Sequence, residues 1–365
     1  MAKKKIVIIG SSIAGASLAY FLARHAEVTV YEQKPQEMLG EKACANIVTP
    51  SFLKYAKHFG LNPWQFIVSK FQKANFFSLN NQLSWKTNEF KIDREKFLDK
   101  LISRAEKKGA EFNFNCEFIN YTLEGDKFVV ILEKDNKKFV ENADILVGAD
   151  GALSRVAKQA DLWKNRKFFL VMQTEIPLKN LKNLHLEKNA YSIYLGKMFG
   201  YYGYIFPFKN KAIMGVGDRI DKAKKYFSNM LKFFKVKSGR IQAALVPEPK
   251  VITSKKNLFL IGDASCNVKF SAGGIIPAIM EAEALKELII NDDLRKIKKL
   301  RKGIFLNKLV TKAILKSKDK DFDNLLQIFK DKKFSEILKN RDEFGKSDYL
   351  KALDVRFLKF MSKLV

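Results

Sequence analysis

Short, uninterrupted apolar runs recur along the chain and predict the strands of one buried sheet. They cover residues 5–9, 28–31, 144–147 and 257–261. A strand without polar alternation suits a parallel sheet that is covered on both faces. Apolar residues at helical spacing follow the first run and recur over 94–107 and 276–290. This order of strands and helices predicts an α/β domain of Rossmann-like type.

The turn after the first strand carries the small residues that a dinucleotide site needs. Gly10 permits a tight turn, and Gly15 lets the following helix approach the strand closely. Ser12 stands where the usual pattern has its middle glycine. The N–H groups at the helix start favour a pyrophosphate, and Glu32 can accept hydrogen bonds from ribose hydroxyls. We predict a dinucleotide site; the alternative is an ordinary βαβ unit without a ligand.

A later segment indicates which dinucleotide is bound. The strand at 257–261 ends in Gly262-Asp263, and a glycine-rich turn then leads into the helix at 276–290. This second helix start favours an anion, and the Asp263 carboxylate suits a polyol hydroxyl. FAD needs such a second site because its ribitol and isoalloxazine extend beyond the ADP half. A third element, GADGALSRV at 148–156 with Asp150, lies between the two. The predicted cofactor is therefore FAD.

A second group of segments alternates between apolar and polar residues, which predicts a half-exposed mixed sheet. The segments are 73–79, 83–85, 168–176, 191–195, 201–206 and 211–216. The predicted fold is a two-domain α/β (α+β) protein. Residues 1–67, 92–165 and 251–290 form a discontinuous Rossmann-like FAD domain, 68–91 and 166–250 form a substrate-binding β-sheet domain, and 291–365 form a helical C-terminal region.

The net charge of +28 favours anionic partners such as nucleic acid, acidic substrates or an anionic membrane surface. No nucleic-acid-binding motif occurs, so we predict no nucleic-acid partner. A second explanation for the high charge is a general bias in amino-acid composition, since Lys, Asn, Ile and Phe are all plentiful. An apolar stripe at helical spacing over 350–364 indicates a docked helix or a helix that lies on a membrane.

The few cysteines and histidines predict neither a metal site nor a disulfide framework. The three cysteines, Cys44, Cys116 and Cys266, have no zinc-site spacing, and the three histidines are scattered. No signal peptide and no apolar run of membrane-spanning length are recognisable. We expect a cytoplasmic protein, with attachment to a membrane surface left open by the charge.

The three nucleotide-site motifs, in this order, resemble the flavoprotein hydroxylase superfamily over residues 3 to 290. A narrower resemblance is to the geranylgeranyl reductase family. GEKACANIVT at 40–49 is similar to its cysteine-bearing loop, and YGYIFP at 202–207 to its Tyr-x-Trp-x-Phe-Pro signature, with Tyr204 in the Trp place. Gly215-Val216-Gly217 matches its Gly-x-Gly, and the segment KIDREKFLDKLISRAEKKGAEF at 91–112, with Arg94, resembles its Arg-bearing helix. The late loop departs: Lys269-Phe270 replaces Asn-Pro, and Ile275 replaces a glycine.

The resemblance implies a set of site residues. It places Cys44 at the active site beside the flavin; the alternative is a small buried hydrophobic residue. The implied cofactor contacts are Gly10, Ser12, Ala14, Gly15, Glu32, Gln33, Cys44, Ala45, Ile47, Arg94, Phe118, Asp150, Gly262, Asp263, Gly274, Ile275 and Ile276. The implied substrate contacts are Tyr202, Tyr204 and Phe206, which alternate and so share one face of their strand; ordinary sheet packing is the alternative.

The resemblance also implies the reaction. It indicates a reductase that saturates C=C bonds in the geranylgeranyl chains of an isoprenoid ether phospholipid, with electrons from NAD(P)H, ferredoxin or another donor. Cys44 and the YGYIFP segment favour this function over an aromatic or polyketide monooxygenase of the same fold. A non-catalytic flavin-binding protein is the third alternative.

Overall fold

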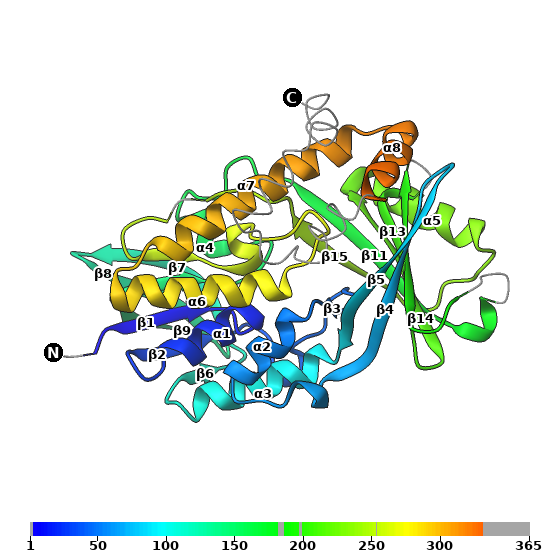
Figure 1. Cartoon of the computed structure of the whole chain (residues 1–365). Helices are drawn as coiled ribbons and strands as arrows, with labels where there is room; N and C mark the ends of the chain where they lie inside the picture. Colours follow the sequence, from blue (N-terminus) through cyan, green and yellow to red (C-terminus); the bar gives the residue numbers. More distant parts are fainter. Residues whose placement is uncertain (1–2, 182–185, 197–198, 253, 331–365) are drawn as a thin grey trace.

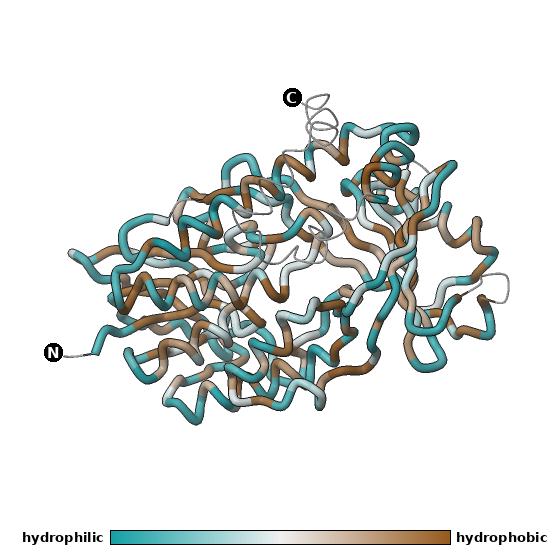
Figure 2. Tube along the Cα trace, in the orientation of Figure 1, coloured by the Kyte–Doolittle hydropathy of each residue, from teal (hydrophilic) through white to brown (hydrophobic). Residues whose placement is uncertain are grey.

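A computed structural model describes residues 3–181, 186–196, 199–252 and 254–330. Its first layer is a five-stranded sheet in the order β16-β10-β1-β2-β6. All four strand pairs are parallel. The strands are β1 (Lys5–Ile9), β2 (Glu27–Tyr31), β6 (Glu111–Asn113), β10 (Ile145–Gly148) and β16 (Leu258–Leu260). Figure 2 shows hydrophobic residues concentrated on β1, as its unbroken apolar run predicts.

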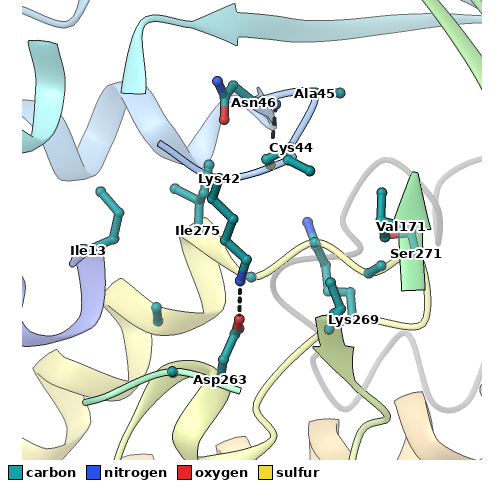
Figure 3. A pocket seen from close by; sticks show the side chains of 18 of the residues that line it. Ile13, Lys42, Cys44, Ala45, Asn46, Val171, Asp263, Lys269, Ser271 and Ile275 are labelled. Carbon is teal, nitrogen blue, oxygen red and sulfur yellow. Dashed lines mark hydrogen bonds and ion pairs between the residues drawn. The ribbon is translucent and has the colours of Figure 1, made fainter. Parts of the chain in front are cut away.

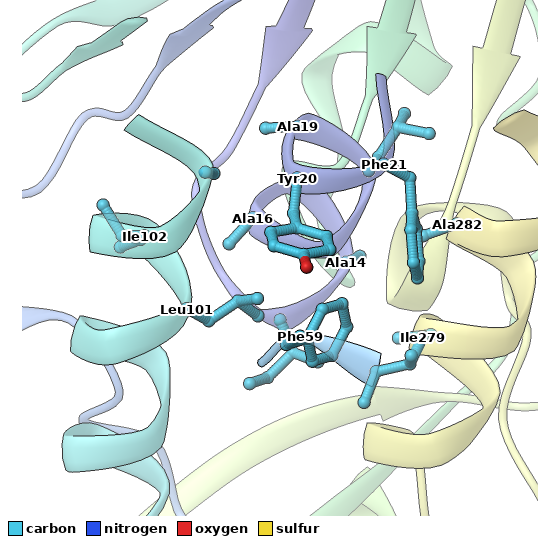
Figure 4. Close-up of a cluster of buried hydrophobic side chains, with 14 of the residues drawn as sticks. Ala14, Ala16, Ala19, Tyr20, Phe21, Phe59, Leu101, Ile102, Ile279 and Ala282 are labelled. Atoms are coloured by element: carbon cyan, nitrogen blue, oxygen red, sulfur yellow. The ribbon is translucent and has the colours of Figure 1, made fainter. Parts of the chain in front are cut away.

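Both faces of this sheet are covered. One face holds α1 (Ile13–Leu22), α2 (Ser51–His58), α3 (Arg94–Glu106) and α6 (Ile275–Asn291), whose buried side chains form the main core. Figure 4 shows Tyr20 of α1 against Phe59, with ring centroids 5.0 Å apart. The other face holds α4 (Arg155–Gln159) and a three-stranded sheet of β7 (Glu117–Glu124), β8 (Lys127–Lys134) and β9 (Lys137–Ala143). Double coverage explains why β1 and β10 lack polar alternation.

The second layer is an eight-stranded mixed sheet in the order β15-β11-β14-β13-β12-β4-β5-β3. Its strands are β3 (Ile47–Val48), β4 (Ile67–Phe77), β5 (Gln82–Ile92), β11 (Phe168–Pro177), β12 (Ala190–Gly196), β13 (Gly200–Phe208), β14 (Lys211–Arg219) and β15 (Ile241–Pro247). Only β12 and β4 pair in parallel within it. Helix α5 (Ile220–Phe233) covers its outer face. The predicted two-domain fold is confirmed.

Two helices join the layers. Helix α7 (Arg295–Lys316) runs from α6 toward the second sheet, and α8 (Asp319–Phe329) lies against β12 and β5 (Figure 1). Asp323 of α8 accepts hydrogen bonds from the Ser78 hydroxyl at 2.5 Å and from the Asn80 backbone N–H at 3.0 Å, in the β4–β5 turn. The apolar stripe expected at 350–364 lies outside the described residues, as does the rest of the predicted helical region beyond residue 330.

Several elements differ from their predicted bounds. The sequence predicts strands at 73–79 and 83–85, but β4 and β5 each run for 11 residues. The buried end of β5 contains the charged residues Glu89 and Lys91, which conceal it from a search for apolar runs. Strands β3, β6, β7 and β15 were not predicted at all. The two-residue strand β3, from the segment assigned to the FAD domain, pairs with β5 of the second sheet.

Candidate active site

One cavity of about 720 Å³ extends between the two layers. Its walls come from the carboxyl ends of the parallel strands, the segment 39–47, the inner face of the second sheet and the two C-terminal helices. All of the predicted site residues line it except Gly15 and Ile276. Gly15 lies behind the turn, where an added Cβ would be 1.9 Å from the Gly10 carbonyl oxygen, and Ile276 belongs to the hydrophobic core.

The turn after β1 has no room for a side chain at Gly10. Gly10 has a φ of 102°, and a Cβ on it would lie 2.4 Å from the carbonyl oxygen of Ala149. Helix α1 begins directly after Ser12, whose side chain makes no capping hydrogen bond. The N–H groups of the first helical turn are therefore available to a phosphate in the cavity.

Glu32 is fixed at the end of β2 and is 9% exposed. Its Oε2 accepts hydrogen bonds from the backbone N–H of Ser11 at 2.9 Å and from the Ser11 hydroxyl at 3.2 Å. Its Oε1 accepts from the backbone N–H of Lys34 at 3.0 Å. Each carboxylate oxygen has more than one acceptor direction, so Glu32 can also accept from ribose hydroxyls.

The middle motif, residues 148–156, makes hydrogen bonds within the protein. The Asp150 carboxylate accepts from the Ser154 hydroxyl at 2.6 Å and from the backbone N–H of Val156 at 3.1 Å, which stabilises the start of α4. Burial raises the pKa of Asp150. Asp150 and Phe118 of β7 both border the cavity, and each Asp150 carboxylate oxygen already accepts one hydrogen bond from the protein.

The late motif surrounds a second helix start. Helix α6 begins after Gly274, and no side chain caps it. Asp263 lies beside this start, since a Cβ on Gly274 would be 3.2 Å from Asp263 Oδ1. Figure 3 shows Lys42 reaching from the cysteine loop to Asp263, with Nζ and Oδ2 2.5 Å apart. Lys269 also lines the cavity, at the position where the resemblance expects Asn.

The cysteine loop, residues 40–47, is held from both layers. The Arg94 guanidinium donates to the carbonyl oxygen of Gly40 and, at 3.5 Å, to that of Lys42. From the second sheet, Lys91 Nζ donates to the Ala45 carbonyl oxygen at 3.2 Å. Burial lowers the pKa of Lys91. Cys44 is half-buried on the cavity wall (Figure 3), and its sulfur accepts from the backbone N–H of Asn46 at 3.4 Å.

One nitrogen of the Arg94 guanidinium has no hydrogen-bond partner in the described residues. This nitrogen, Nε, is buried. An uncompensated buried donor is costly, so an acceptor atom at this point would be stabilising. Arg94 is thus bonded to the loop at the cavity wall and keeps one buried donor without a partner in the described residues.

The aromatic residues of β13 form one wall. Tyr202 and Tyr204 have ring centroids 5.8 Å apart, and Tyr204 and Phe206 5.4 Å. The Tyr204 hydroxyl donates to Gln173 Oε1 at 2.9 Å, and burial raises the pKa of Tyr204 well above its usual value, so the phenol stays neutral. Gln173 in turn donates to the Cys44 carbonyl oxygen at 3.4 Å. Gln173 was not predicted from the sequence.

The far end of the cavity is apolar and comes from α7 and α8. Its residues are Leu306, Val310, Ile314, Phe322, Leu325 and Phe329. They were also not predicted, although their spacing of three or four positions is a helical signal. That signal shows one apolar helix face but not the surface that it covers.

The residues present fit FAD. Two uncapped helix starts border the cavity and can each bind an anionic group, and the carboxylates of Glu32 and Asp263 lie beside them as acceptors. The backbone contact at Gly10 allows the close approach that a pyrophosphate needs. The sequence matches the FAD binding domain family over residues 3–210, more than half of the chain. The chain belongs to this family.

The chain is similar both to curated proteins and to solved structures. A digeranylgeranylglycerophospholipid reductase from Methanocaldococcus jannaschii is 27% identical over 296 residues, which cover 76% of this chain and 74% of that protein. A geranylgeranyl bacteriochlorophyll reductase-like structure from Thermoplasma acidophilum has a TM-score of 0.78 at 19% identity and covers 100% of this chain and 99% of its own. The p-nitrophenol 4-monooxygenase of Pseudomonas putida has a TM-score of 0.69 at 12% identity, covering 99% and 98%.

These comparisons confirm FAD as the cofactor and an FAD-dependent oxidoreductase as the class of protein. The resemblance to the geranylgeranyl reductases is confirmed as well. The two structural similarities establish the fold only, since both a reductase-like protein and a monooxygenase share it. In the described residues, no helix has both the length and the apolar character needed to cross a bilayer.

Proposed function

We propose that this protein saturates the C=C bonds of geranylgeranyl chains on an isoprenoid ether phospholipid. The carrying observation is the continuity of the cavity. It runs from the dinucleotide turn, past Cys44 and the β13 aromatics, to the apolar residues of α7 and α8. The names of the similar curated proteins support the same substrate class.

The apolar lining favours a long hydrocarbon chain. Burying each methylene or methyl group would contribute about 0.8 kcal/mol, so several isoprene units would bind tightly without any polar contact. A monooxygenase that acts on one aromatic ring would instead need a compact pocket with polar groups that fix the ring. The far wall of this cavity has no such groups in its α7 and α8 lining, which is Leu, Val, Ile and Phe.

Saturation of a C=C bond requires a hydride on one carbon and a proton on the other. Bound FAD, once reduced by the electron donor, would supply the hydride. The chain's own residues would hold the alkene over the flavin, exclude water and deliver the proton. Cys44 is a candidate for this last role because it is a free cysteine of the cysteine loop on the cavity wall.

The experiment is a single-turnover assay. FAD-loaded protein, reduced anaerobically by dithionite, is mixed with a geranylgeranyl ether phospholipid, and the lipid mass is followed. We expect a gain of two hydrogens for each double bond reduced. No gain, together with NADPH oxidation that a phenol stimulates, would instead indicate the monooxygenase.

The Cys44→Ala variant tests the proposed role of the thiol. We expect its single-turnover rate to fall by at least about 100-fold while FAD stays bound, the low end of the contribution of a proton-transfer group. The matched control is Cys266→Ala, because Cys266 is buried and does not line the cavity. Full activity in Cys44→Ala would remove the thiol from the mechanism and leave the reductase proposal intact.

A further inference from the structure

Helix α7 has two faces with different tasks. Its inner face contributes Leu306, Val310 and Ile314 to the far end of the cavity. Its outer face carries exposed lysines at 298, 302 and 312, which lie one or more helical turns apart. Positions spaced by three, four or seven residues share one side of a helix. The cavity wall and the basic face therefore belong to the same helix.

The charge of α7 is unusual even in this basic chain. Its 22 residues include Arg295, Lys296, Lys298, Lys299, Arg301, Lys302, Lys308, Lys312 and Lys316 and no acidic residue. At the first turn the cations are paired, since Arg295 bonds Asp293 at 2.9 Å and Lys296 bonds Glu283 at 2.8 Å. The outer lysines farther along the helix present their charge to the solvent.

An apolar side chain stands among these lysines. Phe305 is 51% exposed and lies between Lys302 and Lys312 on the outer side of α7. A basic helix face that also exposes an aromatic ring is typical of helices that lie in a membrane interface, where the lysines meet anionic headgroups and the ring enters the acyl boundary. A nucleic acid would use the lysines but would give Phe305 no apolar environment in a regular duplex.

We infer that the outer face of α7 docks the protein on an anionic lipid bilayer. The occupant is the bilayer because its negative surface complements the lysines and its interior accepts Phe305. The value of this placement rests on the proposed function: the helix that would lie on the bilayer also contributes Leu306, Val310 and Ile314 to the wall of the cavity that would receive a lipid tail. The docking itself needs no catalysis.

The test uses FAD-loaded full-length protein and vesicles of phosphatidylglycerol and phosphatidylcholine in equal amounts, with pure phosphatidylcholine as reference. Binding is measured by flotation. The variant K298E/K302E/K312E reverses three charges on α7. Each lysine near an anionic surface is worth about fivefold in partitioning, so we expect at least about a 100-fold loss.

The matched control is K224E/K225E/K232E. These three lysines are exposed on α5, on the outer face of the second sheet, and the control changes the net charge by the same amount. We expect its partitioning to stay within about fivefold of the wild type, the size of one lysine's contribution. Equal losses in both variants would mean that net charge, and not α7, determines binding, and would overturn the inference.

A second readout follows Phe305 directly. In a Phe305→Trp variant, the added emission should shift to the blue on anionic vesicles and be quenched by lipid-attached quenchers. Emission that does not change while the protein floats with vesicles would show that another surface binds. Tighter binding to a DNA duplex than to vesicles, lost in the α7 variant, would assign the face to nucleic acid and also overturn the inference.

The outcomes separate docking from catalysis. If α7 mediates vesicle binding but no lipid is hydrogenated, the proposed function fails and the docking stands. If detergent-solubilised lipid is hydrogenated and the α7 variant binds vesicles like the wild type, the docking fails and the proposed function stands. We expect the α7 variant to lose vesicle binding and to keep its rate on detergent-solubilised lipid.

Discussion

At the residue scale, two buried carboxylates hold the backbone that directly follows two strands of the first sheet, β1 and β16. Glu32 accepts from the backbone N–H of Ser11, and Glu281 accepts from the backbone N–H of Gly262 at 2.7 Å and from the Ser265 hydroxyl at 2.8 Å. Each carboxylate fixes this backbone by accepting a hydrogen bond from one of its N–H groups. Their difference is that Glu32 also borders the cavity, whereas Glu281 does not.

Glu32→Ala should weaken FAD binding. The loss of hydrogen bonds that ribose hydroxyls donate to a charged acceptor corresponds to roughly 1.5–3 kcal/mol, or a roughly 10- to 150-fold increase in Kd. Quenching of flavin fluorescence during titration measures it. The control is Glu27→Ala on the same strand, where the side chain is exposed and pairs with Lys5 at 3.7 Å. Unchanged affinity in Glu32→Ala would place the adenosine ribose elsewhere.

Glu281 predicts a pH dependence of stability. Burial raises its pKa to about 7, above the usual 4.5, although Gly262 and Ser265 oppose the shift. The folded state then holds the proton more tightly than the unfolded state. This contribution to stability is full below about pH 4.5 and is lost as the pH rises to about 7. We therefore expect the Tm of the wild type to fall more steeply between pH 4.5 and 8 than the Tm of the Glu281→Gln variant. Parallel Tm curves for the two proteins would contradict a raised pKa of Glu281.

At the element scale, β13 and β14 explain why aromatic residues and glycines occur together. Tyr204 lies directly opposite Gly215, and Tyr202 directly opposite Gly217. A Cβ on Gly215 would lie 2.5 Å from the Tyr204 ring, and a Cβ on Gly217 2.8 Å from the Tyr202 ring. The glycines leave space for the two rings to lie across the neighbouring strand. The flat aromatic wall of the cavity therefore depends on both strands.

Gly215→Ala should destabilise this pair of strands. The added methyl group meets the Tyr204 ring and, at 2.7 Å, the backbone oxygen of Met172. Overpacking of this kind costs about 1–3 kcal/mol, which urea unfolding can measure. Gly303→Ala in α7 is the matched control, because nothing lies within 4 Å of its Cβ position and alanine favours a helix. Equal stability of Gly215→Ala and the wild type would mean that the ring moves freely.

At the scale of the whole molecule, the cavity exists only because two sheets and the C-terminal helices meet. Its near end belongs to the first sheet, its middle to the second sheet and its far end to α7 and α8. Asp323 ties α8 to the β4–β5 turn, so the far wall is anchored to the second sheet. A long substrate would contact all three parts.

Val310→Trp should shorten the cavity from its far end. We expect the rate on a 20-carbon geranylgeranyl chain to fall by at least about tenfold, since a bulky side chain in a packed space costs about 1–3 kcal/mol. A 10-carbon prenyl chain should react at an unchanged rate. Leu315→Trp, on the same helix but not in the cavity wall, is the control. Equal losses for both chain lengths would show that the substrate does not extend to α7.

The sequence by itself determined the dinucleotide site and the fold class. Local signals carry these features: an apolar run, a turn that needs Gly10, and a carboxylate at the end of the next strand all lie within about one βαβ unit. The same holds for Tyr202, Tyr204 and Phe206, whose common face follows from the two-residue period of a strand. Such features need only neighbouring residues to be recognised.

Only the tertiary structure decided which distant residues share the cavity. Lys42 meets Asp263 across 221 positions of sequence, and Gln173 meets the Cys44 carbonyl oxygen across 129. No local period encodes such contacts, because they depend on how the two sheets are placed against each other. The buried charges of β5 and the inner face of α7 remained hidden for the same reason. Their residues have ordinary helix or strand patterns, and the packing of the whole chain determines what those patterns face.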